Sequence, residues 1–445
     1  MTESTSPAAD RAIFSATSAA ILVSPLALDI PDPAKLALLG LAFGLTVLAG
    51  PIAAMMLVCL SLAVSSSMLV VGSTEWSPLE LALVACGASV GFAATLEVMR
   101  SRSLRPIARW IGPRDLTFLA GALLVLAVAT MTWIADPDLR SDSLRALRRV
   151  IIEPLFVIPA LTEVRRRSAA FRLVPWLAVP AMGVSILAFV QLALGRSTLD
   201  IGGIERPIGT FTHPNNLSFY LERTVLFAPL LALPFARRYG RVAWLPPAVV
   251  VAATLATISR GAAIALGVGA AILLWEVLRA RWRIYAGLAA IGLLLVFASR
   301  YFAESGDSVD ARRTIWESAI DMIRDRPLTG IGLDQFLGQY GRRYVRPEGW
   351  PERSTSHPPN VVLDFWLSLG IGGLAVLWLL LELCWRRFRA SMNRSAWSVE
   401  RVSVAMIAAG LAHGLIDNSF FLPYLATFTL IGLGLSTVGE ATGDG

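Results

Sequence analysis

Apolar segments long enough to cross a lipid bilayer recur along the whole chain, and this feature limits the fold more than any other. Residues 172–194 and 359–383 are examples, and each has the length of about 20 residues that a membrane helix needs. Hydrophobic residues make up 55% of the 445 positions and charged residues only 16%. Because backbone polar groups inside a bilayer must be hydrogen-bonded within the protein, such segments form helices. The sequence therefore predicts an all-α, polytopic transmembrane helical bundle.

Between twelve and fourteen spans can be assigned, because the shorter segments could be re-entrant or tilted. We expect residues 1–445 to form a single integral membrane domain, and the N-terminus lacks the basic region and cleavage site of a removable signal peptide. The three cysteines lie in apolar segments, so no disulfide framework is expected. The candidate spans are 12–29, 34–50, 51–71, 78–97, 115–134, 149–164, 172–194, 217–236, 242–259, 261–278, 284–299, 359–383, 402–416 and 420–437.

Arginine clusters predict the orientation of the spans. The net charge of +7 is spread in short clusters between apolar segments, a pattern that favours membrane topology over a nucleic-acid partner. Short arginine-rich loops stay in the cytoplasm, which places both termini inside. One basic segment, residues 136–149, falls on the outer side. Either a span near 149–164 is wrongly assigned, or these arginines meet an anionic ligand. The inner clusters are 100–109, 165–172, 237–241, 279–283 and 386–394.

The same topology places several polar segments at the outer face of the membrane. Segment 195–216, the turn at 259–261 and a large loop, residues 300–358, all lie there. Within the loop, helical spacing of apolar residues predicts a helix that is capped by Ser308 or Asp310 and ends at Pro327. This helix lies along the membrane surface, where it either roofs a substrate cavity or serves only to pack the loop.

Charged residues at the outer ends of spans are candidates for binding. Arg260 interrupts an apolar run, and an arginine at this depth either holds an anionic ligand or reaches toward lipid headgroups. Arg206 precedes a polar loop in which Asn215 leads into the next span. Glu222 either pairs with the adjacent Arg223 or lines an outward cavity.

The chain has three histidines, and each has two interpretations. His413 and Asp417 are four residues apart, so on a helix they would share one face, as a general base with its carboxylate or as a polar pair between helices. His357 is either a general base or the cap of the next helix. His213 is expected to be a loop or cap residue.

A metal site is not predicted. The three histidines are far apart and lack paired ligand spacing. Asp136 and Asp138 form an acidic Asp-x-Asp pair on the outer face, but two carboxylates without further ligands are weak evidence for a metal-assisted mechanism. We expect no cofactor.

Five outer-face motifs resemble, in order, the O-antigen ligase and polymerase superfamily of bacterial envelope proteins. They cover residues 206–426, about half of the chain, whereas the N-terminal half resembles the family only in its apolar spans. The motifs are "RPIGTFTHPNNLSFYL", "SRGA", "RTIWESAIDMIRDRPLTGIGLDQF", "SHPPNVVLDFWLSLGIGG" and "HGLIDNSFFLPYLA".

The resemblance implies a metal-independent, inverting glycosyltransferase in the bacterial inner membrane, with its active site facing the periplasm. The donor would be a glycan on undecaprenyl pyrophosphate. The acceptor would be a hydroxyl of lipid A–core or another envelope glycan in a ligase, and a second lipid-linked repeat in a polymerase. The family's pyrophosphate-binding arginines correspond to Arg206 and Arg260, and Arg312 matches the arginine that opens the loop-helix motif.

One position departs from the family pattern. Many ligases read His-x-His-Asn before this span, and the histidine next to the asparagine is the one usually given the catalytic role. Here Asn360 is preceded by Pro359, and His357 matches the first histidine of the pair. His357 therefore acts as the base only if the turn aims it at the site, and otherwise Asp364 or the His413 pair substitutes.

Rival functions remain open at this stage. The motifs do not separate a ligase from an exopolysaccharide polymerase, although their overall look favours a ligase. A lipid-glycan transporter would place charged and broken-helix elements at the bilayer midplane, often in repeated halves, and no internal repeat is visible. Pro359 also raises the possibility of a non-catalytic homologue.

Overall fold

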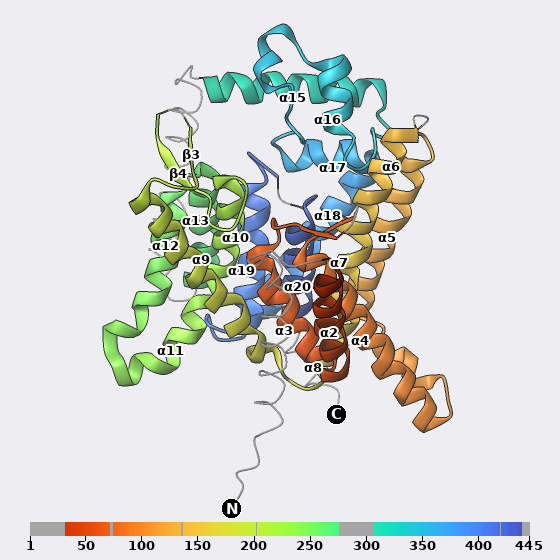
Figure 1. Ribbon diagram of the computed structural model, residues 1–445, viewed down its shortest axis with the longest axis vertical. Coiled ribbons are helices and arrows are strands. Elements are labelled where there is room, and N and C mark those ends of the chain that lie inside the picture. Colours follow the sequence, from red (N-terminus) through yellow and green to blue (C-terminus); the bar gives the residue numbers. More distant parts are fainter. Residues whose placement is uncertain are drawn as a thin grey trace, which may run out of the picture. The chain divides into compact units, whose positions relative to one another are not determined.

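The computed structural model describes residues 32–71, 74–134, 137–201, 203–275, 307–418 and 420–437 (Figure 1). Within these residues the chain is almost entirely helical, which confirms the predicted all-α class, and the strands form two short hairpins. Several predicted features lie outside the described residues: the spans 12–29 and 284–299, the cluster 279–283, Asp136 and the side chain of Asp138.

The chain divides into two compact units, and each is described by itself. The first comprises residues 1–117, 153–262 and 427–445, and the second comprises residues 118–152 and 263–426. Helices α5, α13 and α20 each contain a boundary between units. The single-domain organisation stays a prediction.

The first unit holds most of the long apolar helices. The Ser77 side chain and Glu80 show how one begins: the Ser77 hydroxyl accepts a hydrogen bond from the Glu80 amide (3.2 Å), and the Glu80 carboxylate accepts one from the Ser77 amide (2.7 Å). The elements are α2 (Asp32–Ala49), α3 (Pro51–Ser61), β1 (Leu69–Val71), β2 (Thr74–Trp76), α4 (Pro78–Ser101), α7 (Glu153–Leu155), α8 (Val157–Arg166), α9 (Val174–Leu194), β3 (Thr198–Asp200), β4 (Glu205–Pro207), α10 (Pro214–Thr224), α11 (Ala228–Tyr239), α12 (Leu245–Ala256), the start of α13 (Arg260–Leu274) and most of α20 (Pro423–Leu435).

The second unit contains the large loop and the helices that follow it. Its elements are most of α5 (Arg114–Met131), then α6 (Pro137–Ala146), a π-helical turn (Leu147–Ile152), α15 (Asp307–Asp325), α16 (Phe336–Gln339), a second π-helical turn (Tyr340–Tyr344), a 3-10 turn (Pro347–Glu352), α17 (Val361–Leu369), α18 (Ile371–Ser391) and α19 (Val399–His413).

Helices long and apolar enough to cross a membrane occur throughout the described residues. Four meet this criterion by length and composition, and the number of spans stays a prediction. They are Pro78–Ser101, Arg114–Met131, Ala170–Leu194 and Pro214–Ala256, and shorter apolar helices are Pro33–Ala49, Pro51–Val64, Arg260–Leu274 and Pro423–Leu435.

The loop helix α15 forms where the sequence predicts it. Its inner face, with Ile315 and Ala319 buried, packs against Phe336 and Tyr340. The helix ends before Pro327 as expected. It begins at Asp307, so the prediction that Ser308 or Asp310 caps it is wrong, and both residues lie inside the helix.

The predicted span 359–383 is broken into two helices at Gly370. The φ angle of Gly370 is 66°, in the left-handed region that favours glycine, and a Cβ atom there would clash with the carbonyl oxygen of Leu328. Backbone groups of the loop are bonded to those at the break. The carbonyl of Leu367 accepts hydrogen bonds from the amides of Ile331 (2.8 Å) and Gly332 (3.2 Å), and the amide of residue 371 donates to the Leu328 carbonyl (3.1 Å). The loop is thereby built into the broken helix.

Candidate functional site

His357 faces a carboxylate that lies 60 residues further along the chain. Its Nε2 atom is 3.3 Å from Oδ1 of Asp417, and its Nδ1 atom is 3.0 Å from the hydroxyl of Ser356. An ionised carboxylate only accepts hydrogen bonds, so Nε2 carries the proton of this pair. In the neutral ring Nδ1 is then the basic nitrogen. The side chain of His357 is 26% exposed, which leaves it open to a substrate.

The surroundings of this pair are charged. Burial by itself lowers the pKa of His357, but the hydrogen bond to Asp417 and the negative charges of Asp417 and Asp364 outweigh burial and raise it above its ordinary value. Burial opposes ionisation of Asp417 too. The hydrogen bond from His357 and the nearby His413 and Arg312 nevertheless hold the pKa of Asp417 well below its usual range. The structure therefore brings together five of the predicted site residues.

The predicted pairing of His413 with Asp417 on one helical face is wrong. Helix α19 ends at His413, and Asp417 lies in the turn that follows, where its carboxylate also accepts the amide hydrogen of Asn418 (2.8 Å). His413 is buried, and its electrostatic effect lowers the pKa of Asp417.

The cap of α17 is Asn360, which removes one interpretation of His357. The Asn360 side-chain oxygen accepts hydrogen bonds from the amides of Val362 (2.9 Å) and Leu363 (3.2 Å). Its side-chain nitrogen donates to the carbonyl of Leu415 (3.0 Å), which ties α17 to the turn that carries Asp417. His357 is therefore not the cap of this helix.

Pro359, which stands where many ligases have a histidine, is anchored by the loop helix. The indole nitrogen of Trp316 on α15 donates a hydrogen bond to the Pro359 carbonyl (3.2 Å). Helix α15 also carries Arg312, so the turn that holds His357 and the arginine that acts on Asp417 rest on one element.

Two arginines lie close together in the first unit. Arg206 is on strand β4, opposite Leu199, and Arg260 is the first residue of α13. Partial burial and the positive charge of Arg260 lower the pKa of Arg206. The buried Nε atom of Arg206 has no hydrogen-bond partner among the described residues. Two like charges this close repel each other, and an anion bound between them would remove that repulsion.

The backbone around both arginines is fixed. After Arg206, the side-chain amide of Gln191 on α9 donates to the carbonyl of Gly209 and accepts from its amide, each at 2.8 Å. Before Arg260, Ile258 adopts a φ of 51°, which is strained for a β-branched residue. The next hydroxyl, of Ser259, accepts the amide hydrogen of Ala262 (3.3 Å) and so starts α13. The turn predicted at 259–261 lies slightly earlier, between Ala256 at the end of α12 and Arg260, so Arg260 and Gly261 already belong to α13.

Three other candidates have local structural roles. His213 caps α10, because its Nδ1 atom accepts the amide hydrogen of Asn215 (3.1 Å), as the sequence predicts for a cap residue. Glu222 is fully buried and forms an ion pair with Arg223 at 2.8 Å. Of the two interpretations of Glu222, the structure shows the pair.

Asp334 is a residue of this region that the sequence reasoning missed. It adopts a φ of 57°, uncommon for a residue other than glycine, and its carboxylate acts electrostatically on Asp364. Burial and the charge of Asp142 raise the pKa of Asp334, while Arg145 and Arg149 oppose this effect. The signal in the sequence was an aspartate two residues after the second glycine of "TGIGLDQF".

Known proteins similar to this chain point to one family. A family profile described as O-Antigen ligase matches residues 248–378. The O-antigen ligase of Salmonella typhimurium (strain LT2) is 24% identical over 289 residues, which cover 59% of this chain and 68% of that protein. Both matches agree with the motifs. Together they support the O-antigen ligase superfamily.

The match places part of the candidate site inside the region typical of O-antigen ligases. Arg260, Arg312 and His357 lie within residues 248–378, whereas Arg206 and Asp417 lie outside it. The two matches, together with the apolar helices, support a ligase-like role in a multi-pass membrane protein.

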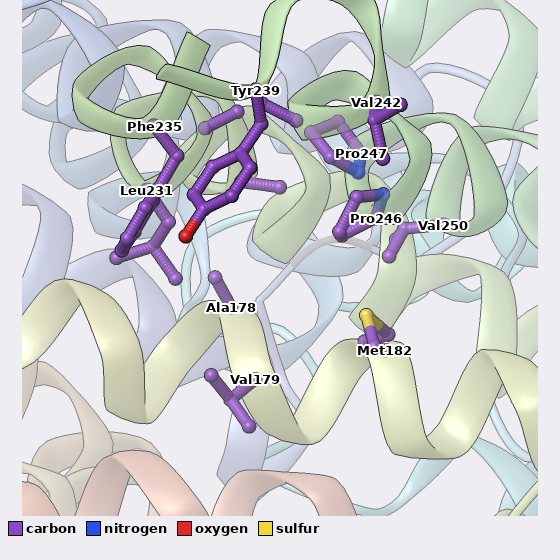
Figure 2. Close-up of a pocket in the computed structure, with 13 residues that line it drawn as sticks. Ala178, Val179, Met182, Leu231, Phe235, Tyr239, Val242, Pro246, Pro247 and Val250 are labelled. Carbon is purple, nitrogen blue, oxygen red and sulfur yellow. The ribbon is translucent and has the colours of Figure 1, made fainter. Parts of the chain in front are cut away.

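A cavity of about 450 Å³ in the first unit is apolar, unlike the charged candidate site (Figure 2). It is lined by apolar side chains of α9, α11 and α12, among them Val179, Leu231 and Val250, and Tyr239 brings a hydroxyl to it. None of the candidate site residues lines this cavity. Its surface suits a hydrocarbon chain and offers little for glycosyl transfer.

Proposed function

We propose that this O-antigen ligase homologue transfers a glycan from undecaprenyl pyrophosphate to an acceptor hydroxyl at the outer face of the inner membrane. The acceptor is a lipid A–core-like molecule or another envelope glycan. The transfer is inverting and independent of a metal ion. The observation that carries the proposal is the pair of His357 and Asp417, because it supplies an oriented base on the large loop.

His357 acts as the general base of the transfer. Asp417 holds Nε2–H and stabilises the positive charge that the ring acquires, in the way a carboxylate orients a catalytic histidine. The acceptor hydroxyl takes the place of the Ser356 hydroxyl at Nδ1, which lies 3.0 Å away. As its oxygen forms a bond to the anomeric carbon, its proton passes to Nδ1.

The leaving group departs from the opposite side of the sugar. The bond between the anomeric carbon and the pyrophosphate oxygen breaks, and its electron pair goes to that oxygen. A single displacement inverts the anomeric configuration. Arg206 and Arg260 hold the pyrophosphate, and arginine suits this task because its fork of N–H groups binds phosphate with two parallel hydrogen bonds. Preorganised positive charge favours the state in which negative charge grows.

Purified protein tests the proposal directly. It would be incubated with an undecaprenyl-pyrophosphate glycan and lipid A–core, and the His357→Ala, Asp364→Ala, His413→Ala and Arg260→Ala variants would be compared with the parent. We expect loss of transfer in His357→Ala and Arg260→Ala, and an undiminished rate in the presence of a chelator. Full activity of His357→Ala would remove this residue from the mechanism, and loss of activity with the chelator would refute the metal-independent reaction.

The same assay separates the alternatives. A ladder of repeats made without lipid A–core would identify a polymerase that joins lipid-linked repeats. Movement of the lipid-linked glycan across liposome membranes without any transfer would identify a transporter. Binding of the donor without either activity would identify a non-catalytic homologue.

A further inference from the structure

Three arginines on the described part of the large loop have acidic partners. Arg313 pairs with Glu317 (3.1 Å) and Arg324 with Asp321 (3.0 Å). Arg346 contacts both of these carboxylates, at 2.6 and 2.7 Å. Exposed pairs of this kind add little stability, but each of these three arginines lies beside a carboxylate.

Three other arginines of the loop are arranged differently. Arg326, Arg342 and Arg343 line one cavity of about 290 Å³, together with Gly338 and Gln339. In the described part of the chain, their guanidinium groups make no ion pair or hydrogen bond. Three positive charges around one cavity repel one another, and an anion bound between them removes that repulsion.

Helix α6 contributes Leu139 to the lining of this cavity and is bonded to the neighbouring loop residues. The hydroxyl of Ser143 donates to the Leu333 carbonyl (2.6 Å), and the side-chain nitrogen of Gln335 donates to the Leu139 carbonyl (2.7 Å) and to Ser143 (2.9 Å). Ser143 and Gln335 are both completely buried. A Cβ atom at Gly338 would lie 2.9 Å from Cδ2 of Leu139, so the end of this leucine side chain would have to shift.

These contacts also bear on the basic segment 136–149. Within its described residues, α6 packs against residues 333–338 of the large loop. No arginine of the segment lines the cavity, so both explanations for the charge of residues 136–149 stay open. The cavity lies at the lower end of the size range of small-molecule sites, roughly 300–1,000 Å³, and so suits one charged sugar.

We propose that the cavity lined by Arg326, Arg342 and Arg343 binds an anionic sugar of the acceptor glycan, through its carboxylate or its phosphate group. This inference rests on the proposed function for the origin of the sugar. The site is distinct from the arginine pair at positions 206 and 260, because different residues line it. It would hold the acceptor by its charge while another part of that molecule presents the hydroxyl.

Binding to the full-length protein in detergent tests the inference without any donor or transfer. The probes are tetragalacturonate, its neutral methyl ester and pentamannose 6-phosphate, and affinity is measured by thermophoresis. Arg326→Gln and the double variant Arg342→Gln/Arg343→Gln are compared with Arg313→Gln and Arg324→Gln, which remove arginines of the same loop that already have acidic partners.

We expect an acidic probe to bind the parent at least about tenfold more tightly than the ester does. The cavity variants should lose about tenfold in affinity for the acidic probe, since each removes hydrogen bonds to a charged group. The control variants should bind within twofold of the parent. The tighter of the two acidic probes then identifies carboxylate or phosphate as the ligand group. Equal binding of tetragalacturonate and its ester, with no binding of the phosphate probe, would overturn the inference. Parent-like affinity of the cavity variants would overturn it too. Because transfer is not measured, failure of the proposed function would leave this result unchanged.

Discussion

The Asp417→Asn variant tests the link between the geometry of His357 and its chemistry. Asparagine keeps the size of the side chain but removes the charge that orients the ring and stabilises its protonated form. General base catalysis contributes roughly 10²–10⁴-fold to a rate. The 3.3 Å separation is longer than a strong charge-assisted hydrogen bond, and the carboxylate is 11% exposed. We therefore expect a loss in the lower part of this range, about 10²–10³-fold in kcat.

The pH profile gives a second readout of the same variant. Only the neutral form of His357 accepts a proton, so transfer by the parent should fall as pH decreases through the raised pKa of His357. Asp417→Asn removes the interactions that raise this pKa, and the acidic limb should move to lower pH while the maximal rate falls.

Initial rates of glycan transfer between pH 5 and 9 check both expectations. Asp325→Asn is the matched control, because Asp325 accepts a hydrogen bond from Tyr344 (2.6 Å) elsewhere on the same loop. A kcat of Asp417→Asn within threefold of the parent, or an unmoved acidic limb, would refute the reasoning.

Three further variants test buried contacts that hold the fold and the candidate site in place. Gln191→Leu leaves buried groups of Gly209 unpaired, so we expect KM for the lipid-linked donor to rise about tenfold; an unchanged KM contradicts the positioning of Arg206. Arg223→Met leaves the buried Glu222 without its ion-pair partner, so we expect the free energy of unfolding to fall by about 3–5 kcal/mol. Denaturation in detergent measures this change. Arg313→Met, at an exposed arginine, is the control and should leave the free energy of unfolding unchanged. Gly370→Ala forces a Cβ atom against the Leu328 carbonyl and should lower the melting temperature by several degrees, whereas Gly121→Ala, which meets no atom, should not.

Features that depend on local sequence were predictable. The loop helix, the presence of a turn next to Arg260 and the capping role of His213 follow from spacing, capping chemistry and breakers within a few residues. The break at Gly370 was not predicted, because the uninterrupted apolar run is typical of one span. The loop backbone that is bonded to it comes from about 40 residues earlier in the chain.

The candidate site was predictable as a set of residues but not as a set of contacts. Arg206 was assigned to a loop and lies on a strand, because a hairpin this short has little pattern to detect. Asp417 was paired with the nearer His413, because helical spacing was extended beyond the true end of α19. Its hydrogen bond to His357 depends on packing between segments 60 residues apart, which no local pattern encodes.

The hydrogen bonds at the Gly370 break determine how this protein could be recombined with its relatives. Because the Leu328 and Leu367 carbonyls bond the loop to the broken helix, the large loop is not a module that can be exchanged alone. A chimera that replaces only residues 307–358 would place foreign backbone against a helix end shaped for this loop. Such an exchange should include residues 361–373 as well as the loop. We therefore expect the two segments to change together among relatives that use different acceptors.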